Sequence, residues 1–249
     1  MLHRALGISK DSVVAFAGAG GKSSAIAAVA DGLTREGMTV IVAPTTKMFL
    51  DEASGIGPIV TSEDVAGLEE EVRRALSDPG AGAIVAGSGL ISKDRVAGLD
   101  PAWFPALRKL AGVTLVESDG SRRRPLKGTA DHEPLLPDSA TLVIAVGNIT
   151  SLGKPLNDEH VHRPEVFSEL TGVALDQTVT AKAFAAALAR GSLRSVPEHA
   201  GRAALVTGVQ PGPPMAAAAV VTRELWRLGV KKVVLSSLPA EKPGKVWMP

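Results

Sequence analysis

A glycine-rich segment between two apolar runs restricts the fold of this chain more than any other feature. Residues 13–17 are apolar, and an alanine-rich run begins at residue 25. Between them lies the glycine loop (residues 18–24), which consists of Gly18, Ala19, Gly20, Gly21, Lys22, Ser23 and Ser24. This order predicts a buried strand, a tight turn and a helix, the arrangement that presents backbone N–H groups and a helix N-terminus to phosphate. We therefore expect an α/β protein that binds a polyphosphate through the whole glycine loop.

The residues of the glycine loop have separate predicted roles. Its three glycines would admit the phosphates at close range, and Lys22 would reach the β- and γ-phosphates. The Ser23 hydroxyl would bind Mg²⁺. The spacing departs from G-x-x-x-x-G-K-[ST], because the first glycine of that pattern would fall at Phe16. The shorter frame G-x-x-G-K-S-S resembles the variant loop of the Mur-ligase family, and the alternative is a glycine-rich turn without a ligand.

Strand-like and helix-like segments alternate along most of the chain. Apolar runs rich in Val and Ile predict strands at residues 13–17, 39–43, 83–86, 114–116, 142–146, 203–206 and 232–235. Helical patterns lie at residues 23–35, 63–76, 101–110, 181–190 and 215–228. This alternation predicts a mostly parallel sheet with helices on both faces, a three-layer α/β sandwich.

The domain organisation is predicted to be simple. We expect one domain over residues 1–249, with an inserted loop or lid at about residues 147–178 that carries one short helix after Pro164. Thr180 is the expected N-cap of the alanine-rich helix, and Gly191 is its expected C′ residue. Residues 239–249 are expected to be a poorly ordered tail.

Composition excludes several classes of function. The chain has no cysteine, so a disulfide, a Cys-ligated metal and a thiol nucleophile are impossible within it. Its 27 basic and 26 acidic residues give a formal net charge of +1, which disfavours nucleic acid and anionic membranes as partners. The N-terminus shows no signal-peptide pattern and no apolar run could span a membrane, so we expect a cytoplasmic protein.

Polar residues follow two more of the predicted strands. Thr45 and Thr46 come after the second strand, where ligands bind in open α/β sheets, and they would contact the metal or the γ-phosphate. Glu117 ends the strand at 114–116, and Gly120 follows it with the spacing of a metal-binding carboxylate and a phosphate-contacting glycine. Asp119 is a second candidate, as a metal ligand or as a base. A polar turn without a ligand is the alternative.

A basic run (residues 122–127) comes next. Its cations would bind a phosphorylated substrate or stabilise transferring charge, with Arg123 in the catalytic role and Arg122, Arg124 and Lys127 on the substrate. Without interleaved aromatic residues it is not typical of a nucleic-acid surface. His132, His162 and Arg163 are further expected substrate contacts. His160 and His162 could alternatively share a metal ion, although no third ligand has an assigned place.

These motifs occur together in one order, and the combination resembles the YqeC family. The resemblance rests on the glycine loop, the Thr45-Thr46-Lys47 turn, residues 117–127, His132-Glu133-Pro134 and residues 161–165, so it covers nearly the whole chain. It implies a P-loop NTPase-like fold. It also implies a role as an accessory protein in maturing the selenium-containing cofactor of molybdenum hydroxylases such as xanthine dehydrogenase.

The resemblance and the residues together predict a nucleotide-dependent protein. The expected ligands are Mg²⁺ and ATP or GTP, with ATP preferred, and the expected protein partner is a molybdenum hydroxylase or another protein of the selenium pathway. Guanine recognition lacks support, because residues 206–210 contain no aspartate of an N-K-x-D motif. The chain would act as an NTP hydrolase or a nucleotide-dependent transferase or ligase. The alternatives are a small-metabolite kinase or ligase and a slow nucleotide-gated chaperone that docks to a hydroxylase.

Overall fold

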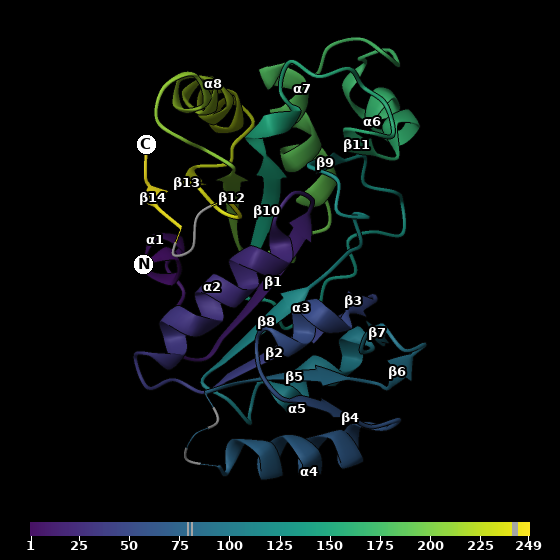
Figure 1. Cartoon of the computed structure of the whole chain (residues 1–249), viewed down its shortest axis with the longest axis vertical. Helices are drawn as coiled ribbons and strands as arrows, with labels where there is room; N and C mark the ends of the chain where they lie inside the picture. Colours follow the sequence, from purple (N-terminus) through teal and green to yellow (C-terminus); the bar gives the residue numbers. More distant parts are fainter. Residues whose placement is uncertain (79, 81, 241–243) are drawn as a thin grey trace. The chain divides into compact units, whose positions relative to one another are not determined.

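The structure is a computed structural model of the whole chain, and it describes residues 1–78, 80, 82–240 and 244–249. It shows an α/β fold with a large, mostly parallel sheet of nine strands and helices packed on it (Figure 1). The strand order is β14-β13-β12-β10-β1-β8-β2-β5-β4. The predicted α/β class is confirmed. No helix in the described ranges is long and apolar enough to cross a membrane.

All seven predicted strands are present in this sheet. They are β1 (Ser12–Gly18), β2 (Val40–Pro44), β5 (Ala83–Gly87), β8 (Val113–Glu117), β10 (Leu142–Asn148), β12 (Gly201–Thr207) and β13 (Lys232–Ser236). Every residue of β2 and β8 is buried. Because successive side chains of a strand point to opposite faces, both faces of these strands are covered, which is why they read as unbroken apolar runs.

The five predicted helical regions are confirmed with shifted ends. They are α2 (Lys22–Thr34), α4 (Val65–Leu76), the 3₁₀ turn η1 (Pro101–Trp103) with α5 (Phe104–Leu107), α7 (Ala181–Ala186) with the π-helix η3 (Ala187–Ser192), and α8 (Pro213–Arg227). Thr180 caps α7 as expected, since its Oγ1 accepts from Ala183 N at 3.2 Å. The expectation for Gly191 is wrong, because the π-helix continues through it to Ser192.

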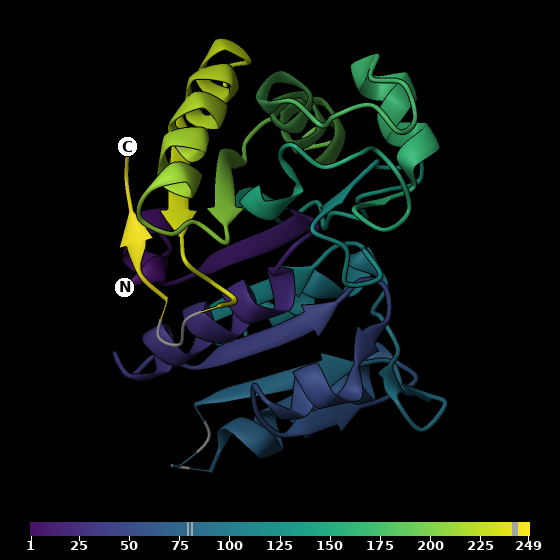
Figure 2. The same cartoon turned by 45° about the horizontal axis from the view of Figure 1, so that its top comes forward.

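The chain divides into two compact units. The first unit comprises Met1–Phe16, Ile26–Gly120 and Leu135–Leu142. In it β1 pairs with β8, β8 with β2, β2 with β5, and β5 with β4 (Ile59–Thr61), all in parallel. The amphipathic α4 packs on β4 and β5, as both views show (Figures 1 and 2). Short elements complete the unit: α1 (Leu2–Leu6), α3 (Leu50–Ser54), and the small antiparallel sheet of β3 (Met48–Phe49), β7 (Arg95–Val96) and β6 (Leu90–Ile91).

The second unit comprises Ala17–Ala25, Ser121–Pro134 and Val143–Pro249. In it β12 and β13 pair in parallel, and α7 and α8 pack against each other (Figure 1). Residues 147–178 contain the 3₁₀ turn η2 (Ile149–Ser151), β11 (Val161–His162) and the expected short helix α6 (Pro164–Thr171). The strand β11 is an addition to the predicted loop, and it pairs in parallel with β9 (Leu126–Lys127).

The end of the chain differs from the expected tail. Val246–Trp247 form β14, which pairs antiparallel with β13 through Leu235 and Ser236. Residues 241–243, which also belong to the predicted tail, lie outside the described residues. Two residues are too short a segment for a periodic pattern, so the sequence carries no signal for this edge strand.

Candidate functional site

The glycine loop has a backbone that only glycine adopts without strain. Gly18, Gly20 and Gly21 have φ of 102°, 76° and 118°. A Cβ atom on Gly18 would lie 2.3 Å from the carbonyl oxygen of Val146, and one on Gly20 would lie 2.3 Å from that of Pro125. Sterics and torsion therefore both demand glycine at positions 18 and 20, and torsion alone demands it at position 21, which is the physical basis of the predicted motif.

Neighbouring segments of the second unit hold the glycine loop in place. Ala19 N donates to Val146 O at 2.9 Å, at the end of β10. The Thr207 hydroxyl, at the end of β12, donates to Gly20 O. Within the described part of the chain, the amides of Gly20 and Gly21 donate to no protein acceptor. Two fixed, half-exposed N–H groups just before a helix are the donors that a phosphate oxygen needs.

Lys22 lies in the first turn of α2 and is almost completely buried, at 3% exposure. Its Nζ donates to Gly18 O at 2.7 Å and reaches Ser121 Oγ at 3.5 Å. The ammonium is therefore held over the glycine loop and beside the residue that precedes the basic run. Ser23 and Ser24 follow it, half-buried, on the same helical turn.

The start of the basic run packs on the glycine loop as well. Pro125 O is the close neighbour of Gly20, and it also accepts from Asn148 N at 2.9 Å. Arg122 and Arg123 both adopt positive φ, 47° and 60°, which is unfavourable for residues with a Cβ. Such strained backbone persists only where the surroundings impose it, and it is concentrated at functional sites.

The pairing of β9 with β11 brings the basic run to the predicted His-Arg pair. Lys127 is opposite His162 in this ladder. Lys127 Nζ donates to Glu133 Oε2 at 2.6 Å, and Arg163 donates to both oxygens of Glu133, at 2.5 and 3.4 Å. Lys127 and Glu133 are buried, so Glu133 is the anion that lets this lysine lie in the interior.

The charges around Glu133 also set the titration of the site. Burial raises the pKa of Glu133, but the hydrogen bond from Arg163 and the charge of Lys127 outweigh it, so the pKa lies below its ordinary value. The pKa of His162 is lowered to about 4 by burial and then by Lys127, Arg163 and Arg122, against an opposing effect of Glu133. His162 is therefore neutral at physiological pH.

Other predicted substrate contacts are placed differently. His132 is exposed, and Arg123 and Arg124 lie in the turn that starts the basic run, with Arg123 exposed and Arg124 half-buried. His160 faces Glu159 at 4.0 Å instead of sharing a metal-like arrangement with His162. Across the described ranges, no three His, Asp or Glu side chains are gathered closely enough to hold a metal ion on their own.

The remaining predicted residues belong to the first unit. Glu117 ends β8 between its neighbours β1 and β2, in register with Phe16 and Pro44. Thr45 N donates to Glu117 O at 2.9 Å, and Thr45 Oγ1 donates to Leu135 O at 3.0 Å, so the turn after β2 is tied to the end of β8. Lys47, next in this turn, is exposed.

Polar groups are concentrated and buried at this end of β2 and β8. Glu117 and Asp119 are 9% and 0% exposed. The hydroxyls of Thr46 and Ser118 are buried and have no hydrogen-bond partner among the described residues. A buried hydroxyl without a partner costs about 1–3 kcal/mol, so such groups call for a ligand or water to satisfy them. Oxygen ligands of this kind suit Mg²⁺, which takes one or two carboxylates and completes its shell with water and phosphate.

Several residues that surround the glycine loop were not predicted from the sequence. Thr207, Asn148 and Ser192 all contact or closely approach the loop, yet the sequence assigned none of them a role there. Thr207 and Asn148 are each the last residue of a strand, β12 and β10. Their position at carboxyl ends of strands is the signal that could have found them.

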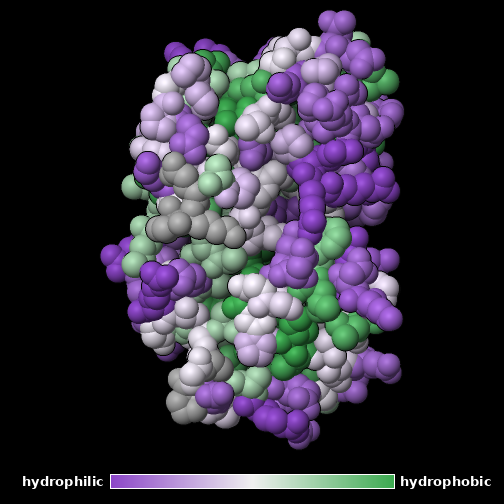
Figure 3. Space-filling model, viewed as in Figure 1, coloured by the Kyte–Doolittle hydropathy of each residue, from purple (hydrophilic) through white to green (hydrophobic). Residues whose placement is uncertain are grey.

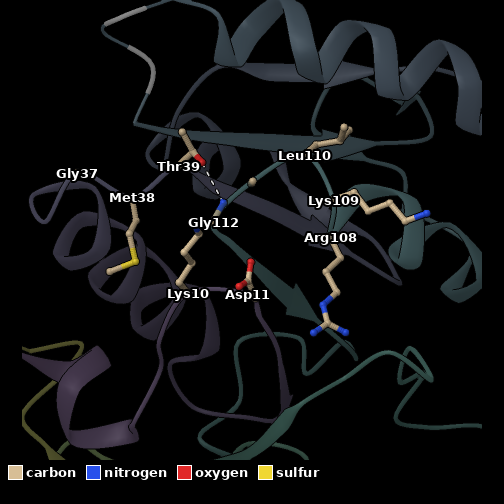
Figure 4. Close-up of a pocket in the computed structure, with 10 residues that line it drawn as sticks. Lys10, Asp11, Gly37, Met38, Thr39, Arg108, Lys109, Leu110 and Gly112 are labelled. Atoms are coloured by element: carbon tan, nitrogen blue, oxygen red, sulfur yellow. Dashed lines mark hydrogen bonds between the residues drawn. The ribbon is translucent and has the colours of Figure 1, made fainter.

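The opposite end of the strands in the first unit carries a pocket. It is lined by Lys10, Asp11, Gly37, Met38, Thr39, Arg108, Lys109, Leu110, Ala111 and Gly112 (Figure 4). These residues precede β1, β2 and β8, so the pocket lies at the amino ends of the strands. The side chains of Arg108 and Lys109 point in different directions, and Gly112 N donates to Thr39 Oγ1 at 2.9 Å (Figure 4). Because the cations do not converge, this pocket is not the candidate site.

Known proteins that match this chain belong to the family that the order of its motifs resembles. The sequence model of a family described as "YqeC protein" matches residues 14–165. A relative from Escherichia coli (strain K12), described as "Uncharacterized protein YqeC", is 33% identical over 193 residues, which cover 76% of this chain and 73% of the relative. The matched range of the family model includes the glycine loop, the polar ends of β2 and β8, the basic run and Arg163.

Proposed function

The chain belongs to the YqeC family, and on that premise we propose that it binds a magnesium nucleotide at the glycine loop. The observation that carries this proposal is the cradle itself. Three glycines with positive φ, the amides of Gly20 and Gly21 that no described acceptor engages, and the buried ammonium of Lys22 occur together at the start of α2. Backbone donors, a lysine and a helix N-terminus are the groups that neutralise and orient a polyphosphate.

Each residue has a role in this proposal. The amides of Gly20 and Gly21 donate to phosphate oxygens, and Lys22 exchanges its bond to Gly18 O for the β- and γ-phosphates. By the order of the sequence motifs, Ser23 and a carboxylate, Glu117 or Asp119, would be the ligands of Mg²⁺, which would supply neutralisation of phosphate charge. Thr45 and Thr46 would contact Mg²⁺ or the γ-phosphate. Arg123 stabilises charge on the transferring group.

The proposed biological role is accessory. The chain uses the nucleotide in maturing the selenium-containing cofactor of a molybdenum hydroxylase, a pathway that the family resemblance brings to the proposal. Because the chain has no cysteine, it cannot carry selenium as a selenosulfide. Its contribution is therefore nucleotide-driven activation, or delivery to a partner that supplies the sulfur or metal ligands.

One observation favours a second candidate, a kinase or ligase that acts on a small anionic metabolite. The start of the basic run packs on the glycine loop, and the run continues into the cluster of Lys127, Arg163 and His162. Cations placed next to a nucleotide site are the groups that hold an acceptor during phosphoryl transfer. Phosphorus NMR of products formed from candidate acceptors distinguishes transfer from simple hydrolysis.

Nucleotide titration of the purified protein tests the binding site. We expect Lys22→Ala to weaken Mg-ATP or Mg-GTP binding by roughly tenfold to a hundredfold, about 1.4 to 2.8 kcal/mol. Lys182→Ala is the matched control, because Lys182 is a solvent-accessible lysine of α7 whose loss removes the same charge. Circular dichroism confirms the fold of both variants. Equal nucleotide affinity of wild type and Lys22→Ala would disprove the assignment.

A further inference from the structure

Three side chains that can donate hydrogen bonds lie around the β9–β11 pair. Arg122 comes from the strained turn before β9, His162 is in β11, and Arg163 is the residue immediately before α6. Lys127 lies opposite His162, behind this surface. Figure 3 shows hydrophilic side chains gathered over β9, β11 and α6 on the face in view. Arg122 is exposed and His162 and Arg163 are half-buried, so these three side chains are accessible from solvent, whereas Lys127 is buried.

The protein's own carboxylate does not use all of the donors here. Glu133 is engaged by Lys127 and by both terminal nitrogens of Arg163. Arg122 has no ion-pair partner and the ring of His162 has no hydrogen-bond partner within the part of the chain that the structure describes. The guanidinium of Arg122 and the N–H of the neutral His162 ring thus remain available to a ligand, next to the guanidinium of Arg163, whose geometry Glu133 fixes.

The charges around His162 are mostly positive. Burial disfavours protonation of its ring most, the charges of Lys127, Arg163 and Arg122 add to this effect, and Glu133 opposes it. The same three cations attract an anion to this place. The backbone supports this interpretation, because positive φ at both Arg122 and Arg123 holds the arginine turn in a conformation that costs about 1–2 kcal/mol per residue.

We propose that Arg122, His162 and Arg163 bind a phosphate-type oxyanion carried by a second substrate. The site lies in the same unit as the glycine loop and joins it through Ser121 and Pro125. Calling the ligand a second substrate rests on the proposed nucleotide function, whereas the anion site itself does not. A tetrahedral dianion suits the donors, because they come from two segments, the turn before β9 and residues 162–163, and not from one planar fork.

Histidine NMR of the full-length protein tests the site. The imidazole signals are followed from pH 8 to pH 3.5, with and without sulfate, a phosphate-like dianion whose charge is constant over this range, and His162→Asn assigns the resonance. We expect sulfate, and inorganic phosphate near pH 7, to shift the His162 signals and to raise its pKa by about one unit, because an anion favours the protonated ring. Arg122→Gln should weaken this anion binding about tenfold.

Controls separate this proposal from the proposed function. Arg223→Gln removes the same charge from an exposed position of α8 and should leave the response of His162 unchanged. Lys22→Ala should lose nucleotide affinity and keep the His162 response. A His162 signal indifferent to both anions, or an equal response in Arg122→Gln, would overturn the anion site, whatever the nucleotide titration shows. An equally strong response to acetate would overturn the phosphate-type assignment.

Discussion

At the scale of single residues, Glu133 organises the second unit's polar interior. It binds Lys127 and Arg163 through its carboxylate, and its carbonyl accepts from Arg194 at 3.2 Å. Arg194 also donates to Ala130 O and to Asp131, so the segment before Pro134 is tied at both ends. The carboxylate of Glu133 thus fixes a buried lysine and the arginine before α6, while its carbonyl helps to hold the loop, and loss of the carboxylate leaves charges without compensation.

Removing the charge of Glu133 should destabilise the protein strongly. In Glu133→Gln the buried ammonium of Lys127 loses its anion, and we expect the free energy of unfolding to fall by about 2–4 kcal/mol. Urea denaturation at pH 7 measures it. Glu198→Gln, at an exposed position, is the control and should change the free energy by less than about 0.5 kcal/mol. A Glu133→Gln variant as stable as the control would contradict the role given to this carboxylate.

His162 should make stability fall as the solution is acidified from pH 6.5 toward pH 4. Its pKa in the folded state is about 4 against an ordinary 6.5, so between these values the unfolded chain binds a proton that the folded chain excludes. Stability from this residue is therefore complete above pH 6.5 and is lost as pH falls through the window. We expect a loss of about 1 kcal/mol between pH 7 and pH 5, after discounting for solvent screening.

The matched measurement compares wild type with His162→Asn in urea at pH 7 and pH 5. The variant should lose less stability on acidification than wild type by about the same 1 kcal/mol. The depressed pKa of Glu133 acts in the same direction but at lower pH, since its contribution is present above about pH 4.5 and is lost below it. Identical losses in the two proteins between pH 7 and pH 5 would show that His162 titrates normally.

At the scale of elements, the glycine loop needs glycine for two separate reasons, which are its positive φ angles and its close contact with neighbouring backbone. Gly20 has φ of 76° and faces Pro125 O, whereas Gly153 in the same unit has φ of 74° and a Cβ added there would meet no atom within 4 Å. Alanine at Gly153 should cost about 1–2 kcal/mol for the left-handed backbone alone. Alanine at Gly20 should cost at least about 2 kcal/mol more, because the loop must move away from Pro125. Urea denaturation of the two variants gives the difference, and equal costs would contradict the close contact.

The elements that the sequence could predict are those with continuous local patterns. The seven main strands are unbroken apolar runs, and α4 shows its apolar face at helical spacing, so periodicity suffices for them. The strands β9, β11 and β14 have two residues each and exist because a partner pairs with them. The roles of Glu133 and Thr207 depend on side-chain contacts with Arg163 and Gly20, which are distant in the sequence, and a single sequence shows no pattern for them.

At the scale of the whole molecule, the candidate residues follow a rule of topology. The glycine loop follows β1, Thr45 follows β2, Glu117 ends β8, Asn148 ends β10 and Thr207 ends β12. Each therefore lies at the carboxyl end of a strand in a mostly parallel sheet, where ligands bind in open α/β folds. The near-neutral net charge fits a protein that concentrates its cations at a small-molecule site instead of spreading them over a surface.

Ligand binding at the glycine loop should appear as stabilisation of the entire chain. A nucleotide that binds only the folded state at a hundred times its Kd adds about 2.7 kcal/mol to the free energy of unfolding. For a chain of this size that corresponds to a rise in Tm of roughly 5–10 °C. Thermal denaturation with Mg-ATP and with Mg-GTP therefore shows which nucleotide stabilises the chain more. The same measurement with each nucleotide in excess EDTA shows whether the stabilisation needs the metal ion. We expect the rise to need Mg²⁺ and to vanish in Lys22→Ala, while Lys182→Ala keeps it. The His162 signals of Lys22→Ala should still respond to sulfate, so loss of the nucleotide effect alone identifies the glycine loop as the nucleotide site.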